Sequence, residues 1–572
     1  MSSQSVVGQC LVITLCSPED RKQIYSLRHE VYALELRQHY ANEERQLRDR
    51  LDERNEYIVV KQGELLLGFI SITPPGGSYP VDKYFSRNAI PVSFDQALYE
   101  IRLLTVLSAH RGRIVAPLLM YGALRYVESH GGSQLVAIGR REVVSMYSRC
   151  GMKSTGAFTR SGAVEYELMT GNVQRVHQAI APMTRGFERL TDAVDWQLPF
   201  AFSPADHCYH GGAFWGVLSE DFSDLGRSQQ IINADVLDAW FDPAPAVLST
   251  IAKSLPLLVR TSPPTHAEGL VKAISRARGV PALCILPAAG SSALLFMAFQ
   301  SWFSPRSRVL LLDPMYGEYR HVFENVIRCT VDSVVAKAEN TFRLDLREVE
   351  ERLHERPDAV VLVNPNSPTG TLLSQKSLAE LIARFPSTRF WIDETYIEFC
   401  GSEHSLERFA SGSANAFVCK SMSKVYALSG LRVAYLVGPS AEIAELSRLV
   451  PPWAVSLPAQ VAAVAALAEP SYYAAQYCAT AELREQLASR LRTECGIVAF
   501  PSVTNCLLCA LPPNASGADE VVDRARKHNL FIRSGAGIHP SLGPNTIRIA
   551  VKSESMNERT VAILRELLSV IA

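Results

Sequence analysis

Short apolar runs alternate with amphipathic segments along most of the chain, and the pattern changes character twice. Over residues 1–172 it predicts a strand, a charged helix, further strands such as "YIVVKQGELLLGFISIT", and then a strand–helix–strand sequence. A Pro- and Gly-rich loop, Pro74–Pro80, interrupts this block. We therefore expect a mixed α+β domain over residues 1–172.

Residues 228–572 follow a second pattern, in which amphipathic helices separate apolar runs such as "RVLLLDP", "AVVLVNP", "RFWIDE" and "AYLVG". Strands of this kind are typical of a mostly parallel sheet with helices on both faces, so the sequence predicts an α/β domain. Residues 173–227 begin with a predicted helix, "VQRVHQAIAPMTRGFERL", and continue without a clear period. We interpret them as a linker.

Composition and charge narrow the class of protein. Of the 572 residues, 47% are apolar and 20% are charged, and the formal net charge is −1. Without a basic excess, nucleic acid is not expected as a partner. The stretch Val6–Cys16 is shorter than the ~20 residues of a membrane span and has no basic region before it, so it predicts an opening strand. We expect a cytoplasmic protein without a membrane partner.

The cysteines do not indicate a metal site. Twelve are scattered along the chain, and the only C-x-x-C motif, Cys506–Cys509, lies in a strand-like run. Side chains three residues apart on a strand point to opposite faces, so joint chelation is unfavourable there. We expect buried apolar thiols and no metal.

One lysine in the second block has neighbours suited to an aldehyde cofactor. In "KSMSKVYALSGLR", residues 420–432, Lys424 follows Ser421 and Ser423 and precedes Arg432. An amine forms a Schiff base with an aldehyde, whereas hydroxyls and a guanidinium hold a phosphate. Pyridoxal phosphate carries both groups and is a candidate ligand if further anchors for it occur in the chain.

Further candidate anchors lie where predicted strands end, which is the edge that binds ligands in open α/β sheets. Asp393 ends the strand of "WIDETYIEF", and Tyr396 follows three residues later. In "PAAGSSALL", Gly290 precedes Ser291 and Ser292 at the expected start of a helix. Amides and hydroxyls at such a terminus favour a phosphate.

Two more motifs complete the set. "VNPNSPTG", residues 363–370, follows the strand "AVVLV", and "LLDPMYGEY" offers Tyr316, whose ring could stack on a flat cofactor. In this order, the five motifs resemble those of fold type I pyridoxal-phosphate enzymes of the class I/II aminotransferase group, nearest the histidinol-phosphate aminotransferase branch. The resemblance covers residues 228–572 and implies a mostly parallel central sheet, a small α+β subdomain and a homodimer.

The resemblance implies a role for each matching residue. Lys424 would carry pyridoxal phosphate as a Schiff base and move the Cα proton, and Asp393 would pair with the pyridine nitrogen. Tyr396 would donate to O3′ of the ring, and Tyr316 would stack on the ring face. Arg548, in "TIRIAV", would bind the α-carboxylate of an amino acid substrate. The residues implied for the phosphate are Ser291, Ser292, Ser421, Ser423 and Arg432.

The sequence departs from the family pattern at two places. The family usually has Asn directly before "PTG", where this chain has Ser367, so Asn366 or Asn364 is the candidate for the O3′ contact. The family also usually has a Tyr before Pro that reaches the phosphate of the neighbouring subunit, and here Ser262 precedes Pro263. The reaction therefore stays open between transamination, decarboxylation, elimination and replacement.

In the first block, "YEIRLLTVLSAHRGRIVAPLLMYGALRYVESHGG" predicts strand, loop and helix, and "LVAIGRREVVSMYSRCGM" predicts a strand and a helix with a Tyr four residues before a Gly. These segments resemble the GNAT acyltransferase fold, over about residues 10–172. "IYSLRHEVYALELRQ" and "LDERNEYIVV" are similar to acyl-homoserine-lactone synthases and N-acyl amino acid synthases. The resemblance implies acetyl-CoA or another acyl thioester as co-substrate.

In this fold, the loop before the helix donates amides to the pyrophosphate of coenzyme A. Ile114 stands where the first Gly of the usual R-x-x-G-x-G/A pattern belongs, so either the donor binds differently, for example on a carrier protein, or catalysis has been lost. Tyr147 matches the residue that protonates the leaving thiolate, and Glu100 is the candidate base for the acceptor amine. The residues assigned to the donor loop are Arg111, Arg113 and Ala116.

Together the two resemblances predict a bifunctional biosynthetic enzyme, with pyridoxal phosphate chemistry on an amino acid followed by acylation of the resulting amine. One alternative is C–C bond formation from S-adenosylmethionine and NAD, of the azaindane type, followed by acetylation. Another is a simple aminotransferase with a GNAT-like module that binds without catalysis, for which Ile114 is the argument. A transcription regulator ranks last, because residues 1–172 have neither a recognition-helix pattern nor a basic excess.

Overall fold

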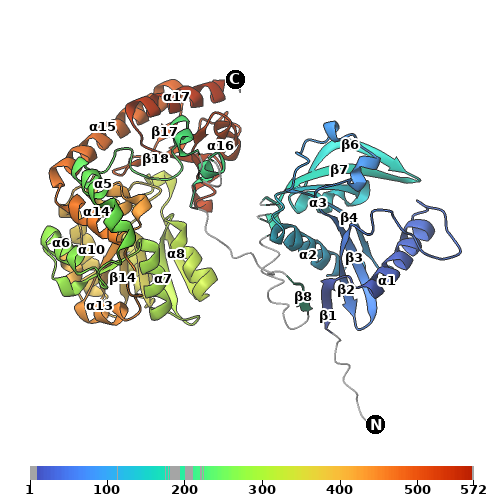
Figure 1. Ribbon diagram of the computed structural model, residues 1–572, viewed down its shortest axis with the longest axis horizontal. Coiled ribbons are helices and arrows are strands. Elements are labelled where there is room, and N and C mark those ends of the chain that lie inside the picture. Colours follow the sequence, from blue (N-terminus) through green and yellow to red (C-terminus); the bar gives the residue numbers. More distant parts are fainter. Residues whose placement is uncertain are drawn as a thin grey trace, which may run out of the picture. The chain divides into compact units, whose positions relative to one another are not determined.

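The computed structural model describes residues 10–112, 114–173, 175–177, 179–180, 194–199, 210–218, 222 and 224–569. Two compact units divide the chain, Met1–Asp206 and His207–Ala572 (Figure 1). Both units combine helices with sheets, so the predicted α/β class is confirmed. Among the described helices, none is both long and apolar enough to cross a membrane.

An eight-stranded sheet organises the first unit, in the order β6-β7-β5-β4-β3-β2-β1-β8. Its first strand is the opening strand predicted from the sequence. The edge strand β8 pairs in parallel with β1 and comes from the segment expected to be a linker. The strands are β1 (Leu11–Leu15), β2 (Glu56–Gln62), β3 (Leu65–Thr73), β4 (Leu98–Val106), β5 (Gln134–Arg140), β6 (Lys153–Ser161), β7 (Val164–Asn172) and β8 (Val194–Gln197).

Helices cover both faces of this sheet, because neighbouring strand residues point to opposite sides and both sets are apolar. Val59 of β2 packs in a cluster with α1 (Pro18–Arg28), whereas its neighbour Ile58 packs in a cluster with α2 (Val115–Ser129). The shorter helical elements are η1 (His29–Glu35), η2 (Pro80–Lys83) and α3 (Val144–Arg149).

The strands β4 and β5 separate in the middle of the sheet. They pair in parallel only up to Ile101 and Ala137, although both strands continue. A β-bulge lies just beyond this point, where Leu103 has φ +54° and the register of β4 with β3 shifts. Because a bulge bends its strand, the facing edges of β4 and β5 have no strand partner beyond Ala137.

A seven-stranded sheet forms the centre of the second unit, in the order β10-β16-β15-β14-β13-β11-β12. Its strands are parallel except for β16, which runs antiparallel to both neighbours. The central strands are almost entirely buried, as expected for a sheet covered on both faces. The strands are β10 (Ile285–Ala288), β11 (Arg308–Asp313), β12 (Thr330–Val335), β13 (Ala359–Val363), β14 (Arg389–Asp393), β15 (Ala416–Ser421) and β16 (Ala434–Val437).

The helices around this sheet have the amphipathic pattern predicted from the sequence. α7 contacts β10, β15 and β16, and α14 packs against α5 and α6. The helices are α5 (Pro245–Arg260), α6 (Glu268–Arg278), α7 (Ser291–Trp302), α8 (Gly317–His321), α9 (Leu346–Leu353), α10 (Gln375–Arg384), α11 (Glu407–Gly412), α12 (Met422–Val425), α13 (Ser440–Ser447) and α14 (Leu457–Leu467).

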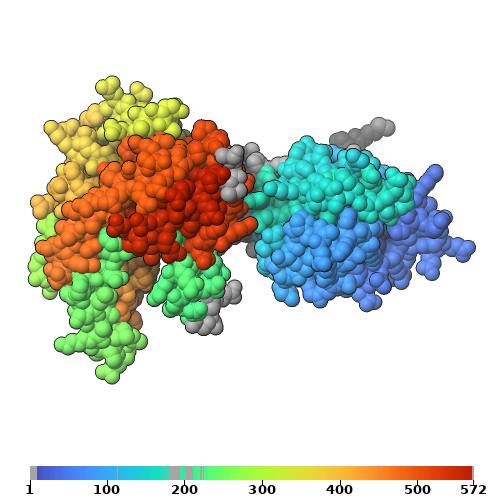
Figure 2. Space-filling model, turned by 90° about the horizontal axis from the view of Figure 1, so that it is seen from above, coloured from blue at the N-terminus to red at the C-terminus, as the bar shows by residue number. Residues whose placement is uncertain are grey.

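A smaller four-stranded antiparallel sheet, β17-β18-β21-β20, forms the subdomain near the C-terminal end. The helices α15 and α17 lie side by side and share a hydrophobic core with β18 and β21 (Figure 1, Figure 2). Cys506 and Cys509 of β18 are both buried, and the described residues contain no metal-binding cluster of His, Cys, Asp or Glu. The elements are α15 (Pro470–Cys495), β17 (Val498–Ala499), β18 (Cys506–Ala510), α16 (Ala518–Arg526), β20 (Arg533–Ser534), β21 (Thr546–Ala550) and α17 (Glu554–Ser569), and a separate pair joins β9 (Ile232–Asn233) to β19 (Leu530–Phe531).

The segment expected to be a linker is divided between the two units. Val194–Gln197 joins the sheet of the first unit, whereas the His210 imidazole contacts Glu318 of the second. The predicted helix over residues 173–190 lies largely outside the described residues. The described part, residues 173, 175–177 and 179–180, is helical.

Candidate active sites

The carboxyl ends of β13, β14 and β15 bring the motifs of the second unit together. Asp393 at the end of β14 is in register with Cys419 of β15, and α12, which carries Lys424, begins directly after β15. The Asn364 amide, just after β13, donates to the Asp393 carbonyl at 2.8 Å. Since parallel strands end at one edge, the "NPNSPTG", "WIDE" and "SMSK" motifs share that edge.

Lys424 forms an ion pair that the sequence did not indicate. Its Nζ lies 2.7 Å from Oδ1 of Asp238, in the loop after β9. Burial raises the pKa of Asp238, but the Lys424 ammonium outweighs this, so that pKa lies below its usual range. A second lysine, Lys552, donates to the Asp238 carbonyl at 3.2 Å, and burial lowers its pKa to about 8. Lys424 is therefore held by a carboxylate and has a second amine nearby.

Asp393 is buried and held rigidly by three donors. The Tyr319 hydroxyl donates to Oδ2 at 2.7 Å, and the Thr395 amide and hydroxyl donate to Oδ1 at 2.9 and 2.6 Å. The Trp391 indole donates in turn to the Tyr319 hydroxyl at 3.0 Å. Burial raises the pKa of Asp393, so a cationic partner at this position would be favoured.

The N-terminus of α7 and Arg432 form a cradle of donors. Gly290, the N-cap of α7, has φ +92° and ψ 162°, and a Cβ there would lie 2.5 Å from Nη2 of Arg432. The Arg432 guanidinium also donates to Oγ of Ser423 at 3.4 Å, and Oγ of Ser421 accepts from the Ser423 amide at 3.3 Å. Ser291 and Ser292 occupy the first two positions of α7. Arginine, hydroxyls and helix amides that meet at one point are suited to a phosphate.

Tyr316 and Tyr396 belong to the same region. Tyr316 precedes α8 and stacks on His210, with ring centroids 5.3 Å apart. Burial raises the pKa of Tyr396. The charges of Asp393 and Tyr316 raise this pKa further, whereas Arg548 lowers it, so these three groups lie near the phenol. The predicted ring-stacking, ring-hydroxyl and carboxylate-binding residues are thus brought close to Asp393.

The buried polar atoms without a hydrogen-bond partner among the described residues include Oδ1 of Asn366 and Nε of Arg548, both in this region. Asn366 uses its amide NH₂ on the Pro314 carbonyl and the Thr369 hydroxyl, and Arg548 donates Nη2 to the Asp235 carbonyl. Both amide groups of Asn364 pair with the backbone of Leu373, so Asn366 is the asparagine with remaining capacity. Such unsatisfied groups at a strand edge indicate a ligand.

The residues present fit pyridoxal phosphate. The Lys424 amine suits the aldehyde, and the buried Asp393 carboxyl group suits the ring nitrogen. The Tyr316 ring suits the ring face, and the Arg432 guanidinium at the start of α7 suits the phosphate. The Arg432 guanidinium can lie against the start of α7 only because Gly290 has no side chain.

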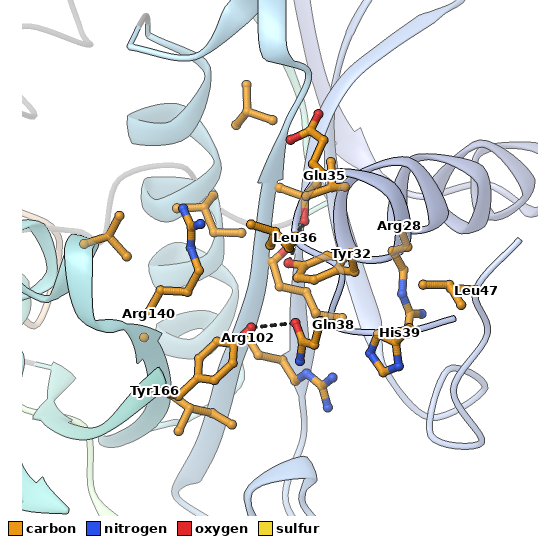
Figure 3. A pocket seen from close by; sticks show the side chains of 18 of the residues that line it. Arg28, Tyr32, Glu35, Leu36, Gln38, His39, Leu47, Arg102, Arg140 and Tyr166 are labelled. Atoms are coloured by element: carbon orange, nitrogen blue, oxygen red, sulfur yellow. Dashed lines mark hydrogen bonds between the residues drawn. The ribbon is translucent and has the colours of Figure 1, made fainter. Parts of the chain in front are cut away.

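A cavity of about 360 Å³ opens in the first unit where β4 and β5 separate (Figure 3). Its wall combines the bulged part of β4, the end of β5, η1 and the loop after it, and α3. The Tyr166 hydroxyl donates to the Gln38 amide oxygen across one side, at 2.7 Å. The edges of β4 and β5 give this cavity backbone donors and acceptors that an extended amide chain can use.

Tyr147 of α3 lines this cavity beside β5. A Cβ on Gly139 would lie 3.1 Å from two carbons of the Tyr147 ring, so the glycine allows the ring to lie against the strand. Burial raises the pKa of Tyr147, so the phenol stays protonated at neutral pH. A protonated hydroxyl in this position can act as an acid.

The N-terminus of α2 differs from what the sequence suggested. Ile114 is the N-cap, but its side chain packs against the core and does not line the cavity. Pro117 removes one first-turn donor, which leaves the amides of Val115 and Ala116 without helical partners. Arg111 lines the cavity and pairs with Glu35 at 2.7 Å. The predicted donor residue Arg113 lies outside the described residues.

Glu100, the candidate general base, does not line this cavity. It is fully buried on β4, where Oε2 accepts from the Val81 amide of η2 at 2.9 Å and Oε1 has no partner among the described residues. Burial raises its pKa to about 7. The structure therefore places Glu100 beneath the helical turn that carries Lys83.

Family models match parts of both units. The model of the aminotransferase class I and II family matches residues 243–564, more than half of the chain. The chain belongs to the class I and II aminotransferase family. The model of the acetyltransferase (GNAT) family matches residues 21–152. The protein is thus a pyridoxal-phosphate-dependent transferase domain joined to a GNAT acetyltransferase domain.

Curated relatives and solved structures are similar to the second unit. Histidinol-phosphate aminotransferase from Moorella thermoacetica is 28% identical over 305 residues, 52% of this chain and 76% of the relative. The structure of histidinol-phosphate aminotransferase from Sinorhizobium meliloti, in complex with pyridoxal-5'-phosphate, has TM-score 0.55 and 20% identity, over 64% of this chain and all of that one. L-threonine-O-3-phosphate decarboxylase from Porphyromonas gingivalis has TM-score 0.53 and 22% identity, over 59% and 100%. At these identities the structures establish the fold alone.

Sequence reasoning missed several residues of both sites. Tyr319 could have been noticed three positions after Tyr316, but nothing in its local sequence links it to Asp393. Asp238 and Lys552 lie in segments without a recognised motif and meet Lys424 only through the fold. The charged residues at one end of the GNAT cavity were missed for the same reason.

Proposed function

We propose that this protein is a bifunctional biosynthetic enzyme, in which the aminotransferase-like domain transforms an amino acid and the GNAT domain acylates an amine from an acyl thioester. The observation that carries the proposal is the presence of two separate groups of reactive side chains in one chain. The Lys424–Asp238 pair lies in one unit, and Tyr147 lines a cavity in the other.

In the second unit, pyridoxal phosphate would supply an electron sink for bonds to the Cα of an amino acid. Lys424 is the residue that would hold it covalently, with Asp238 fixing the amine. Asp393, oriented by Tyr319 and Thr395, would face the ring nitrogen. Arg432 and the start of α7 would hold the phosphate, and Arg548 would bind the substrate carboxylate through its unsatisfied Nε.

In the GNAT domain, the partnerless edges of β4 and β5 would bind the amide-containing arm of acetyl-CoA or a carrier-bound acyl thioester. Tyr147 would protonate the leaving thiolate, since its pKa is raised and the proton is available at neutral pH. Glu100 is left out of this step because it lies outside the cavity.

The proposal is tested by separating the two activities in the full-length protein. Lys424→Ala should abolish the visible absorbance band of bound pyridoxal phosphate and all amino acid turnover, while acetyl-CoA-dependent thiol release with an amine panel continues. Tyr147→Phe should abolish the acetyl-CoA-dependent thiol release and leave the cofactor band and the amino acid turnover unchanged. If acetyl-CoA binds but no amine is acylated, the GNAT domain is a binding module and the bifunctional proposal is wrong.

A second candidate reaction is C–C bond formation between the amino acid part of S-adenosylmethionine and the nicotinamide ring of NAD, instead of transamination. The departures at Ser367 and Ser262 leave room for this reaction. Lys552, whose Nζ lies 3.2 Å from the Asp238 carbonyl, would be a second group for proton transfer in it. Release of methylthioadenosine from S-adenosylmethionine would support this reaction. Clean formation of a 2-oxo acid from an amino donor would exclude it.

We also propose that the protein is a homodimer. α5 exposes four large apolar side chains, with exposed fractions between 45% and 73%: Leu248, Leu255, Leu257 and Val259. Leu248, Leu255 and Val259 are spaced seven and four residues apart and share one face of α5, whereas Leu257 lies on another side. An exposed apolar face of this kind is typical of a subunit interface. Fold type I sites are usually completed by such an interface.

A further inference from the structure

One end of the GNAT cavity carries an excess of positive charge. We call it the cationic end and define it by Arg28, His39, Lys83 and Arg102, all of which line the cavity. In Figure 3 the side chains of Arg28, His39 and Arg102 gather on one side, away from Glu35 and Arg140. They come from α1, the segment after η1, and β4.

The carboxylates at this end do not balance these cations. Asp52 accepts two hydrogen bonds from the Arg28 guanidinium, at 2.8 and 2.9 Å, so its charge is already paired with that of Arg28. Asp49 accepts from Lys83 at 2.6 Å, and the same oxygen lies 4.0 Å from Arg102. Three permanent cations therefore share two carboxylates, and Arg102 has the weakest counterion.

Arg102 is partly buried, and the fold fixes its position. Its side chain is only 14% exposed, and it directly precedes the bulge at Leu103 that separates β4 from β5. Leaving a guanidinium in such a position without a close carboxylate is costly unless a ligand supplies the anion. The bulge thus holds Arg102 at the cavity wall.

His39 reports the same positive potential. Burial and the neighbouring Arg28 and Arg102 lower the pKa of its imidazole, Lys83 lowers it further, and Asp49 alone among the facing groups opposes this. The imidazole is therefore neutral at neutral pH. An anion that entered the cationic end would reverse this effect and allow His39 to take up a proton.

We propose that the cationic end of the GNAT cavity binds the carboxylate of the acyl acceptor, with Arg102 as the principal contact, so that the acceptor is an amino acid and not a simple amine. The inference rests on the proposed acyl transfer in this cavity and names its substrate class. A carboxylate at Arg102 would place the acceptor within the same cavity that Tyr147 lines.

The same positive charge could be met by the phosphates of coenzyme A, and the geometry argues against this. The donor-side arginine, Arg111, is paired with Glu35, which lies far from His39 in Figure 3. Arg102 and Arg111 therefore serve different ends of the cavity. This difference makes the two sources of anion separable by experiment.

The test compares acceptors and ligands that differ only in the acid group, on the full-length protein. L-leucine and L-methionine are compared with leucinol and methioninol as acceptors of the acetyl group from acetyl-CoA. Arg102→Gln should raise KM for the amino acids at least tenfold and leave KM for the amino alcohols and for acetyl-CoA within twofold. Arg102→Lys should restore part of the difference.

Direct binding separates this inference from the proposed function. N-acetyl-L-leucine should bind by calorimetry, N-acetyl-leucinamide should bind at least tenfold more weakly, and Arg102→Gln should remove the difference. Arg160→Gln, an exposed arginine of β6 away from the cavity, is the matched control. Equal binding of acid and amide overturns the inference. A preference for the acid without any acetyl transfer supports the anion site and overturns the catalytic proposal instead.

Discussion

At the scale of single residues, the two sites differ in how their ionisable groups are used. Asp238 and Asp393 have partners that fix their position, whereas Glu100 is buried with one oxygen that accepts no described hydrogen bond. Burial raises the pKa of Glu100 and outweighs the lowering effect of Arg102 and Lys83, so the protonated carboxyl group is favoured. Glu100 is therefore a source of pH-dependent stability.

We expect the first unit to lose stability as the pH rises from about 5 to 8. Glu100 has a pKa of about 7 in the folded protein against 4.5 as the ordinary value, so the folded state holds a proton that the unfolded state has lost between these limits. The difference corresponds to about 3 kcal/mol. Glu100→Gln should remove most of this loss, measured by urea unfolding at pH 5 and pH 8. An unchanged pH dependence in the variant would contradict the assignment.

A residue-scale prediction also applies to the cationic end of the GNAT cavity. Because a bound carboxylate raises the pKa of His39, binding should be accompanied by proton uptake. The affinity should rise as the pH falls below the pKa of His39 in the complex and level off below the lowered pKa of the free protein. Calorimetry of N-acetyl-L-leucine in buffers of different ionisation enthalpy measures this uptake. His39→Gln should abolish the uptake, and an equal uptake in that variant would refute the role of His39.

At the scale of elements, the start of α7 depends on one backbone conformation. Gly290 has φ +92° and ψ 162°, a combination that costs other residues of order 1–3 kcal/mol, and Arg432 occupies the place of a Cβ. The glycine therefore lets the guanidinium reach the helix terminus. The consequence concerns cofactor binding more than folding.

Gly290→Ala should weaken pyridoxal phosphate binding at least tenfold, because the new methyl group displaces Arg432 from the phosphate position. Titration of the cofactor-free protein, followed by absorbance, measures the change. Gly412→Ala is a suitable control, since a Cβ at Gly412 would meet no atom within 4 Å. If both variants bind the cofactor equally well, the cradle has been assigned wrongly.

The elements also show what the sequence could predict. The apolar runs predict the strands that end at Asp393 and just before Lys424, because a polar residue follows each run. In the sheet these two strands are neighbours. The contact between Asp238 and Lys424 could not be predicted from the sequence, because the loop after β9 has no periodic pattern and the contact depends on tertiary packing. For Glu100, the alternation along β4 could not show that η2 covers it. Local patterns predict elements, whereas contacts between distant loops require the fold.

At the scale of the whole molecule, the exposed face of α5 predicts self-association. Val259→Glu should convert the dimer to a monomer, measured by light scattering, and should weaken cofactor binding if the second subunit completes the site. Lys253→Glu changes the charge on an exposed position of the same helix and should leave the dimer intact. A wild-type protein that is monomeric at micromolar concentration would disprove the proposal.

The parallel pairing of β8 with β1 has a practical consequence for dissecting the molecule. A fragment cut at residue 172, where the family resemblance ends, would lack Val194–Gln197 and leave the backbone groups along one side of Leu11–Leu15 open to other chains. Such a piece should precipitate or oligomerise by adding foreign strands. A fragment extended through residue 199 carries its own edge protection and is the better starting point for studying acyl transfer in isolation.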